Sequence, residues 1–257
     1  MKIDTVLLSG AGNTFHIFNS QDESQSLAVS AQKELTKKVC LQNPADGMIF
    51  LKKSDATNTY QWQFYNNDGS DAEMCGNATR CVGYYIKNIL GDTGEQWYLN
   101  TTAGRILIQA LSNNMFEVKM TAIQEMESKH GFYCNTGVPH LVLELLHFDE
   151  YKTKKEMARG LRMHADFAPA GTNVTFIGLS STPSKVKAVS FERGVEDFTE
   201  ACGTGAMAAA FYNLKKQNCA KTEVEMPGGT LMMDVSNPNK PIMVGSATSL
   251  GKFSYEA

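Results

Sequence analysis

The chain carries the same sequence pattern twice, about half its length apart. Residues 72–90 (AEMCGNATRCVGYYIKNIL) align with residues 199–217 (TEACGTGAMAAAFYNLKKQ), and in both a Cys-Gly pair precedes an apolar helical pattern. Two further pairs of segments repeat in the same order: 9–18 with 135–144, and 101–110 with 225–235. Ordered repeats of this kind predict two similar halves around a pseudo-twofold axis.

The rest of the chain mixes strand and helix patterns. Strands are expected at 46–53, 59–66, 105–111, 116–121, 140–145, 174–179 and 185–191. Helices are expected at 26–39, 75–89, 149–162 and 202–217. We therefore predict an α+β fold of two domains, which are residues 1–120 with the C-terminal strand 248–257, and residues 121–247. The active site is expected in the cleft between them.

Composition excludes several classes of function. The 257 residues are 42% hydrophobic and 20% charged, as in an ordinary globular protein. A net charge of −3 gives no electrostatic basis for binding nucleic acid or an anionic membrane. The N-terminal apolar run is too short for a signal peptide, and no stretch approaches the roughly 18 apolar residues of a membrane span. We expect a cytoplasmic protein whose cysteines are thiols.

The repeated Cys-Gly pairs predict a chemical role for Cys75 and Cys202. A helix N-terminus carries unpaired backbone N–H groups and the positive end of the helix dipole. A cysteine at that position is expected to have a lowered pKa, so that its thiolate forms near neutral pH. The glycine-containing segments that follow, 76–77 and 203–205, would offer backbone donors to a carboxylate.

Two cysteines that face one amino acid define a reaction. One thiolate removes the α-proton from one face, and the other cysteine, as a thiol, delivers a proton to the opposite face. The N–H groups at the helix ends would stabilise the enediolate-like intermediate between the two steps. The pattern therefore predicts inversion at carbon without a metal or pyridoxal phosphate.

Other roles for the cysteines fit the pattern less well. A buried cysteine usually acts as a small hydrophobic residue, which suits Cys40, Cys81, Cys134 and Cys219. The spacing of Cys75 and Cys81 argues against a zinc site or a structural disulfide. The absence of a Cys-x2-Cys motif argues against thioredoxin-like chemistry, and the mirrored Cys-Gly motifs argue against a protein that only binds a ligand.

Polar residues near turns are the next candidates. Asn173, Glu192 and Arg193 lie in or beside turns, and Arg suits a carboxylate whereas Glu suits an ammonium group. The alternative for the charged pair is a solvated surface ion pair. His140 could supply an acid or a base, although one His beside a strand is more often structural. The segment GAGNTF (10–15) lacks the third glycine and the following helix of a dinucleotide-binding loop.

Several motifs together resemble the diaminopimelate epimerase family across almost the whole chain. They are GAGNTF at 10–15, NNDGSDAEMCGNATRC at 66–81, GVPHLV at 137–142, TNVTF at 172–176, FERGVEDFTEACGTGA at 191–206 and MPGGTL at 226–231. The two cysteine motifs and their separation are highly specific in combination. The resemblance implies two pseudo-symmetric domains, each a curved, barrel-like β-sheet around a central α-helix.

The resemblance also implies a reaction and its residues. Family members convert LL-diaminopimelate to meso-diaminopimelate, a precursor of lysine and peptidoglycan, without a cofactor or a metal. Carried over by position, Cys75 and Cys202 are the acid/base pair. His140, in the GVPHLV segment, is a candidate for a supporting role. The substrate-binding positions are Asn13, Asn66, Gly76, Asn77, Asn173, Glu192, Arg193, Gly203 and Thr204. The expected partner is a small amino-acid substrate, and because family members are often dimers a homodimer is expected.

Three positions depart from the family pattern. Thr14 stands where Asp is usual, Ala78 where Gly is usual, and Val138 where many members have Asn before Pro-His. Val138 removes a donor from the pocket for the distal, unreactive amino-acid centre, so this departure affects the choice of substrate and leaves the reaction unchanged. The alternative function is a racemase of another amino acid, such as histidine, glutamate or lanthionine. The MCGNA motif lacks the histidine of the proline-racemase branch.

Overall fold

The computed structural model describes residues 2–21, 27–72 and 74–256 of the chain. The chain divides into two compact units. Unit 1 comprises Met1–Val118 with Gly245–Ala257, and unit 2 comprises Lys119–Val244. Among the described residues, no helix is both long enough and apolar enough to cross a membrane.

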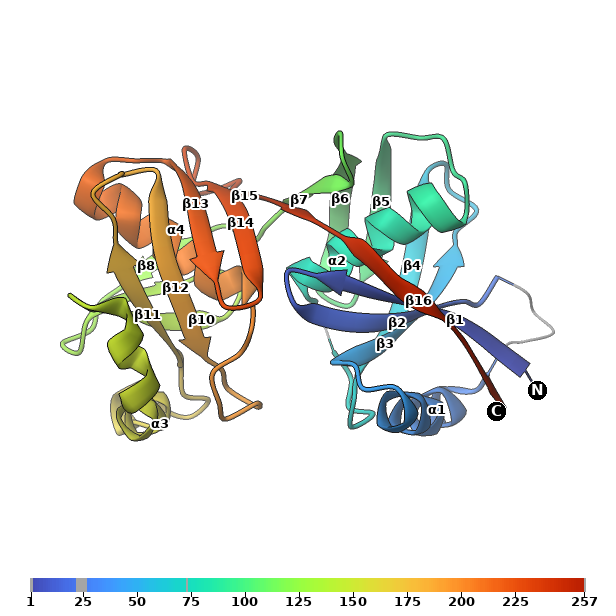
Figure 1. Ribbon diagram of the computed structural model, residues 1–257, viewed down its shortest axis with the longest axis horizontal. Helices are drawn as coiled ribbons and strands as arrows, with labels where there is room; N and C mark the ends of the chain where they lie inside the picture. Colours follow the sequence, from blue (N-terminus) through green and yellow to red (C-terminus); the bar gives the residue numbers. More distant parts are fainter. Residues whose placement is uncertain (1, 22–26, 73, 257) are drawn as a thin grey trace. The chain divides into compact units, whose positions relative to one another are not determined.

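Unit 1 is built on a mixed sheet (Figure 1). Its strands are β1 (Lys2–Gly10), β2 (Asn13–Asn19), β3 (Gly47–Lys53), β4 (Thr59–Asn66), β5 (Gln96–Thr101), β6 (Gly104–Ala110), β7 (Met115–Lys119) and β16 (Thr248–Glu256). They lie side by side in the order β16, β1, β2, β3, β4, β5, β6, β7. Helix α1 (Val29–Gln42) connects β2 with β3, and helix α2 (Gly76–Tyr84) with the π-helix η2 (Tyr85–Ile89) connects β4 with β5.

The strands of unit 2 are likewise arranged in a mixed parallel and antiparallel order. They are β8 (Gln124–Met126), β9 (Phe132–Asn135), β10 (Pro139–Glu144), β11 (Asn173–Leu179), β12 (Lys185–Phe191), β13 (Lys221–Met226), β14 (Gly229–Asp234) and β15 (Ile242–Ser246). They lie side by side in chain order. The 3-10 helices η3 (Phe148–Thr153) and η4 (Ala165–Phe167), with α3 (Lys155–Arg162) between them, connect β10 with β11. Helix α4 (Gly203–Gln217) connects β12 with β13.

The two sheets repeat one pattern of strand directions. In unit 1, neighbouring strands are antiparallel except for the parallel pairs β2–β3 and β4–β5. In unit 2, the parallel pairs β10–β11 and β12–β13 stand at the same places in the order. Each parallel pair needs a crossover connection, and each crossover contains a helix. The sequence repeat is therefore a fold repeat, which confirms the predicted α+β class.

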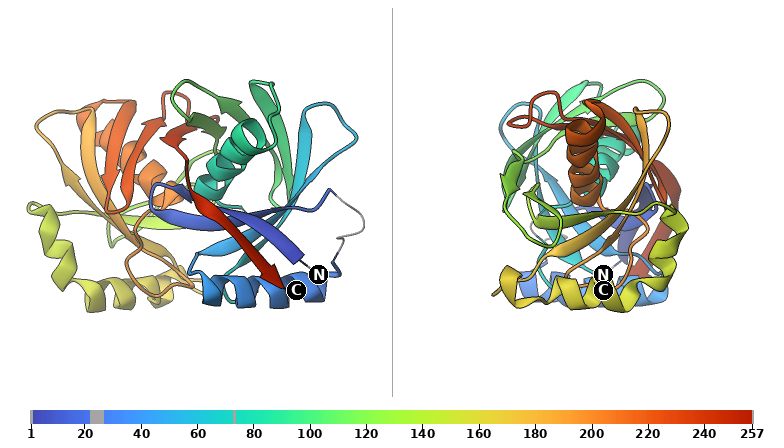
Figure 2. Two further views of the ribbon diagram at one scale, coloured as in Figure 1. Left: turned by 45° about the vertical axis from the view of Figure 1, so that its right-hand side comes forward. Right: turned by 90° about the vertical axis from the view of Figure 1, so that its left-hand side faces the viewer.

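The sheet of unit 1 curls around α2 (Figure 2). The helix packs against β1 and β2 near one end of the strand order and against β6 near the other end, which a flat sheet would not allow. Every residue from Gly76 to Gly83 is buried. Ala78, Cys81 and Val82 belong to the same core cluster as Trp97. A helix enclosed in this way has no solvent face, so it does not need a polar stripe.

Helix α4 is enclosed in the same manner by unit 2. It packs against strands from β9 to β14, and all residues from Gly205 to Asn213 are buried. Much of this run is alanine, which has the highest helix propensity and lets the strands approach the helix axis closely. The implied architecture, a curved sheet around a central helix, is thus present in both units.

Three predicted helices differ in detail from the structure. The helix predicted at 149–162 is η3 followed by the shorter α3. Phe148 and Tyr151 both pack on the sheet core, and their spacing of three residues suits a 3-10 turn, which brings residues i and i+3 to one side. The last five residues of the helix predicted at 75–89 form the π-helix η2. The start predicted at residue 26 lies outside the described residues, and α1 begins at Val29.

Candidate active site

Cys75 and Cys202 occupy equivalent places, directly before the two central helices. Cys75 is the N-cap residue of α2, with φ −142° and ψ 122°. Cys202 is the N-cap residue of α4, with φ −131° and ψ 106°. In both cases the backbone is extended at the cysteine and becomes helical at the glycine that follows. The first N–H groups of each helix therefore lie beside the cysteine, where they have no partner within the helix.

The Cys202 thiol is enclosed by its own helix. Cys202 is only 4% exposed. Its Sγ accepts a hydrogen bond of 3.3 Å from the Gly205 N–H. Thr204 Oγ1 lies 3.4 Å from the same sulfur. The Cys202 N–H in turn donates to Met226 Sδ at 3.5 Å. These contacts fix the sulfur at the helix N-terminus.

The protonation of Cys202 differs from the expectation drawn from the sequence. Burial is the largest cause that raises the pKa of this thiol well above its usual range, and the nearby Glu192 carboxylate raises it further. Hydrogen bonds from Thr204 and Gly205 act in the opposite direction and offset only part of this rise. The predicted lowering of the Cys202 pKa is therefore wrong, because desolvation outweighs the helix terminus. Cys202 is a thiol at neutral pH.

A chain of hydrogen bonds leads from Cys202 into the sheet of unit 2. Thr204 Oγ1 lies 3.0 Å from His140 Nε2, and His140 Nδ1 lies 2.9 Å from Thr175 Oγ1. The Thr175 hydroxyl is 2.9 Å from Ser190 Oγ. His140 is fully buried, and burial lowers the pKa of its imidazole to about 3. The ring is thus neutral, and it orients the Thr204 hydroxyl that contacts the thiol.

The buried His140 should make the fold sensitive to acid. In the unfolded chain an imidazole binds a proton below about pH 6.5, whereas burial lowers the pKa of His140 in the fold to about 3. Between these values the unfolded state binds one more proton, so the free energy of unfolding should fall towards acid pH. The slope contributed by His140 should approach about 1.4 kcal/mol per pH unit. Urea titrations between about pH 7 and 5 would measure it.

A matched variant isolates the contribution of His140. Gln in place of His140 keeps a neutral hydrogen-bonding side chain but cannot titrate, so its slope should be smaller by up to about 1.4 kcal/mol per pH unit. Burial also lowers the pKa of His16. This residue is present in both proteins, so its contribution to the slope cancels in the comparison. The carboxyl of Asp92, held at a pKa of about 2, stays ionised over this range. Equal slopes in the two proteins would contradict the prediction.

Three predicted binding residues lie close to this chain of hydrogen bonds. Asn173 Nδ2 is 3.3 Å from His140 Nε2, and its Oδ1 accepts the Arg193 N–H at 2.8 Å. Glu192 accepts a hydrogen bond from the Thr199 hydroxyl. The side chain of Arg193 is exposed. Unit 2 therefore gathers its predicted residues on the strand ends and the loop that precede α4.

In unit 1 the corresponding network surrounds the start of α2. Asn77 is 1% exposed, and its Nδ2 donates to Asn13 Oδ1 at 2.6 Å. Arg80, also buried, donates from Nη1 to Asn77 Oδ1 at 2.9 Å and from Nε to the Ser246 carbonyl at 3.3 Å. Burial lowers the pKa of Arg80 to about 10, so it remains a cation, and its charge interacts with Cys75. A buried guanidinium attracts a thiolate at that position.

The remaining predicted residues have simpler surroundings. Gly76 and Gly203 are the first residues of α2 and α4. Asn66 ends β4, is exposed, and donates from Nδ2 to Ser70 Oγ at 2.9 Å. The predicted positions thus fall into two sets, one in each unit, and Asn66 has its own partner apart from the Asn13–Asn77 network.

Several residues of these networks are not among those predicted from the sequence. Arg80 lies within a helical pattern, where a charged residue is expected to face solvent. Thr175 and Ser190 are ordinary strand residues, and only the antiparallel register of β11 and β12 sets them opposite each other. Thr199 carries no motif of its own. Thr199 stands three residues before the repeated Cys-Gly pair, and this spacing is the one sequence signal that suggests a role for it.

Known proteins match the chain over most of its length. The family model for diaminopimelate epimerase matches residues 5–125 and 132–250. A diaminopimelate epimerase from Aquifex aeolicus is 33% identical over 92% of this chain and 91% of its own length. Another from Archaeoglobus fulgidus is 30% identical over 96% of this chain and 94% of its own length.

Solved structures share the fold at lower sequence identity. A Bacillus anthracis phenazine biosynthesis protein of the PhzF family has a TM-score of 0.78 at 14% identity and covers 100% of both chains. A hydroxyproline epimerase from Agrobacterium vitis, solved with bound trans-4-hydroxy-L-proline, has a TM-score of 0.64 at 12% identity. That match covers 98% of this chain and 92% of the other.

The doubled fold, the helix-capping cysteines and these relatives define the class of the protein. It is an isomerase of the epimerase and racemase type. More narrowly, the chain belongs to the diaminopimelate epimerase family.

Proposed function

We propose that the protein interconverts LL- and meso-diaminopimelate, with Cys75 and Cys202 as its acid/base pair. One observation carries the proposal: each cysteine caps the central helix of one of two units with the same strand pattern. Inversion at carbon needs one proton-transferring group on each face of the reacting centre. A repeated fold that carries one such group per repeat meets this need if both thiols reach the same α-carbon.

The two thiols take different roles in the first half of a turnover. Cys75, as a thiolate, removes the α-proton, and the C–H electron pair moves into the α-carboxylate to give an enediolate-like dianion. Cys202 then donates its S–H proton to the opposite face, and the carbon regains four bonds with inverted configuration. Burial and the Glu192 carboxylate, which raise the pKa of Cys202, support its role as the donor. No net proton is gained or lost.

The charge that develops on the carboxylate needs donors in fixed positions. We assign this role to the backbone N–H groups at the starts of the two helices, at Gly76, Asn77, Gly203 and Thr204. Hydrogen bonds from preorganised helix N-termini favour the dianion more than the starting carboxylate, because the charge is larger in the intermediate.

The distal amino-acid centre of diaminopimelate does not react but has to be recognised. We assign its recognition to the polar groups that the family pattern implies: Asn13, Asn66, Asn173, Glu192 and Arg193. The exposed Arg193 guanidinium is suited to a carboxylate, and a planar fork can bind both oxygens at once. Val138, in place of the Asn found in many members, offers no polar side-chain atom here. The alternative substrate, another amino acid such as histidine, glutamate or lanthionine, rests on this residue.

Isotope exchange tests the proposal directly. The protein is incubated with LL-diaminopimelate in D2O, and the meso isomer and deuterium at the α-carbon are followed by chromatography and mass spectrometry. We expect the meso isomer to form with one α-deuterium, because the donating thiol exchanges with solvent. A parallel panel contains L-histidine, L-lysine, L-glutamate and lanthionine. Faster racemisation of an amino acid without a second amino-acid centre would overturn the substrate assignment.

A further inference from the structure

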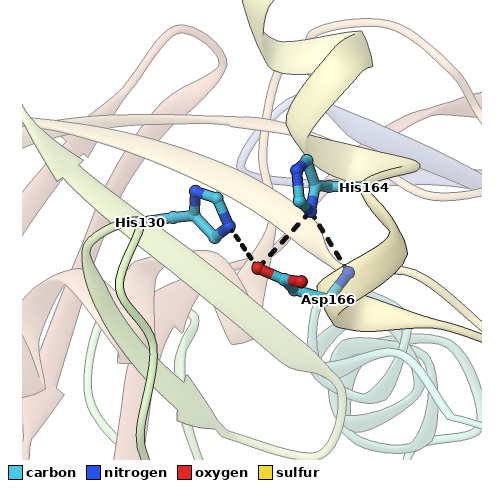
Figure 3. Close-up of side chains that lie close together, drawn as sticks. All are labelled: His130, His164 and Asp166. Carbon is cyan, nitrogen blue, oxygen red and sulfur yellow. Dashed lines mark hydrogen bonds and ion pairs between the residues drawn. The ribbon is translucent and has the colours of Figure 1, made fainter.

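A second cluster of reactive side chains lies in unit 2, outside the hydrogen bonds around Cys202. It consists of His130, in the segment before β9, and of His164 and Asp166, which flank the start of η4 (Figure 3). His130 Nε2 lies 2.7 Å from Asp166 Oδ2, and His164 Nδ1 lies 3.7 Å from the same oxygen. One ligand atom from each residue falls within 4.8 Å of the others.

These separations suit a bound metal ion. Zinc binds imidazole nitrogen and carboxylate oxygen at about 2.0–2.2 Å, so neighbouring ligand atoms in a tetrahedral site stand about 3.4 Å apart. The separations of 2.7 and 3.7 Å bracket this value. Shifts of up to about 0.7 Å would bring these two separations to the tetrahedral value, and the third pair of ligand atoms already lies within 4.8 Å. Two imidazoles and one carboxylate favour zinc, cobalt or nickel over magnesium or calcium, which prefer oxygen ligands.

The charges around Asp166 are compatible with a cation at this place. The carboxylate oxygen Asp166 Oδ2 is contacted by both Lys129 Nζ and His130 Nε2. Lys129 Nζ lies 2.9 Å from Asp166 Oδ2, but its side chain is 74% exposed and can move into solvent when an ion replaces it. A metal ion at His164 Nδ1 would also have to replace the Asp166 N–H, which donates to that nitrogen at 3.1 Å. Water can then accept a hydrogen bond from that N–H, because Asp166 is exposed.

The surroundings hold the ligands and leave access for the ion. Phe167 packs against both imidazoles, with ring centroids 5.6 Å from His130 and 6.3 Å from His164. A pocket of about 630 Å³ is lined by the segment 126–133 together with Asp166 and Phe167. It provides a path for entry and room for water as a fourth ligand. Packed ligands beside an open position are typical of a three-ligand metal site.

We propose that His130, His164 and Asp166 bind a divalent transition-metal ion of the zinc type. The ion joins the segment before β9 to η4 and so stabilises this side of unit 2. It takes no part in the epimerisation, whose residues are elsewhere in the chain. Zinc would therefore change the thermal stability of the protein whether or not the proposed reaction is correct.

Metal titration of the purified, chelator-treated protein tests the proposal. Calorimetry with Zn²⁺ should show one site per chain, and Co²⁺ should give the visible absorption of a nitrogen- and oxygen-bound ion. Zn²⁺ should also raise the melting temperature, since a ligand that binds only the folded state stabilises it. Each of the variants His130→Gln, His164→Gln and Asp166→Asn should weaken Zn²⁺ binding by about tenfold or more.

The control is His147→Gln, which removes an exposed histidine outside the cluster. This variant should bind Zn²⁺ with unchanged affinity and show the same rise in melting temperature. Circular dichroism of each metal-free variant establishes that it is folded. Wild-type affinity in the His130→Gln and His164→Gln variants would mean adventitious surface binding and would overturn the proposal. The absence of any binding to the folded wild-type protein would also overturn it.

Discussion

Alanine in place of Cys202 should reduce kcat for epimerisation of LL-diaminopimelate by about 10³-fold or more, because a positioned acid or base contributes 10²–10⁴-fold. Cys75→Ala should have a similar effect, since inversion needs both groups in one turnover. The double variant should be scarcely slower than either single variant, as expected for groups that act as a unit. Chiral chromatography of the LL and meso isomers over long incubations would measure all three rates.

The matched control for these variants is Cys219→Ser. Cys219 is a partly exposed thiol after α4, whose sulfur contacts only the carbonyl of Lys221 among the described hydrogen bonds. Its replacement should leave kcat and KM within about twofold of wild type, because surface changes have small effects. A Cys202→Ala or Cys75→Ala variant that keeps activity within tenfold of wild type would refute the two-thiol mechanism.

Alanine in place of Gly205 should destabilise unit 2 by about 2 kcal/mol and reduce activity strongly. A Cβ at this position would overlap Ser190 Oγ and lie 3.3 Å from the Cys202 Cβ. Overpacking of a rigid core costs about 1–3 kcal/mol. To make room, Ser190 would have to rotate and release the Thr175 hydroxyl, which loosens the chain of hydrogen bonds that ends at the thiol. Urea unfolding and kcat would report the two effects.

Two matched variants make the Gly205 prediction specific. In a Ser190→Ala background the overlapping oxygen is absent, so the further cost of Gly205→Ala should fall below about 1 kcal/mol. Gly160→Ala is the control for helix propensity, because Gly160 lies in α3 with no atom near the added methyl group. It should stabilise the protein by about 0.5–1 kcal/mol. Equal costs of Gly205→Ala with and without Ser190 would show that the overlap is not the cause.

The order of the elements could be predicted from the sequence because the two halves carry the same residue pattern. Cys75 and Cys202 mark the starts of α2 and α4, where the repeated pattern predicts both helices. The alternation of polar and apolar residues located strands such as β4 and β12, which run from 59 to 66 and from 185 to 191. Local patterns of this kind depend only on neighbouring residues, so one sequence is enough to reveal them.

The state of the site could not be predicted in the same way. The pKa of Cys202 depends on burial inside the curved sheet and on Glu192, neither of which follows from the helix start alone. The partners of His140 come from a neighbouring strand and from α4, so they are set by strand register and helix packing. Ala78, a departure from the family pattern, proves to be a fully buried core residue of α2. Sequence spacing contains no information on such contacts.

The strand β16 has a consequence for how the protein is made. It pairs antiparallel with β1, so that Lys2 lies opposite Glu256, and unit 1 combines segments that precede and follow unit 2 in the sequence. Unit 2 is continuous in sequence. On the ribosome, all of unit 2 is therefore synthesised before the last strand of unit 1 exists. Until then one edge of β1 remains open to pairing with other chains. The unit that begins first is completed last, because β1 gains its β16 neighbour only after unit 2 has been made.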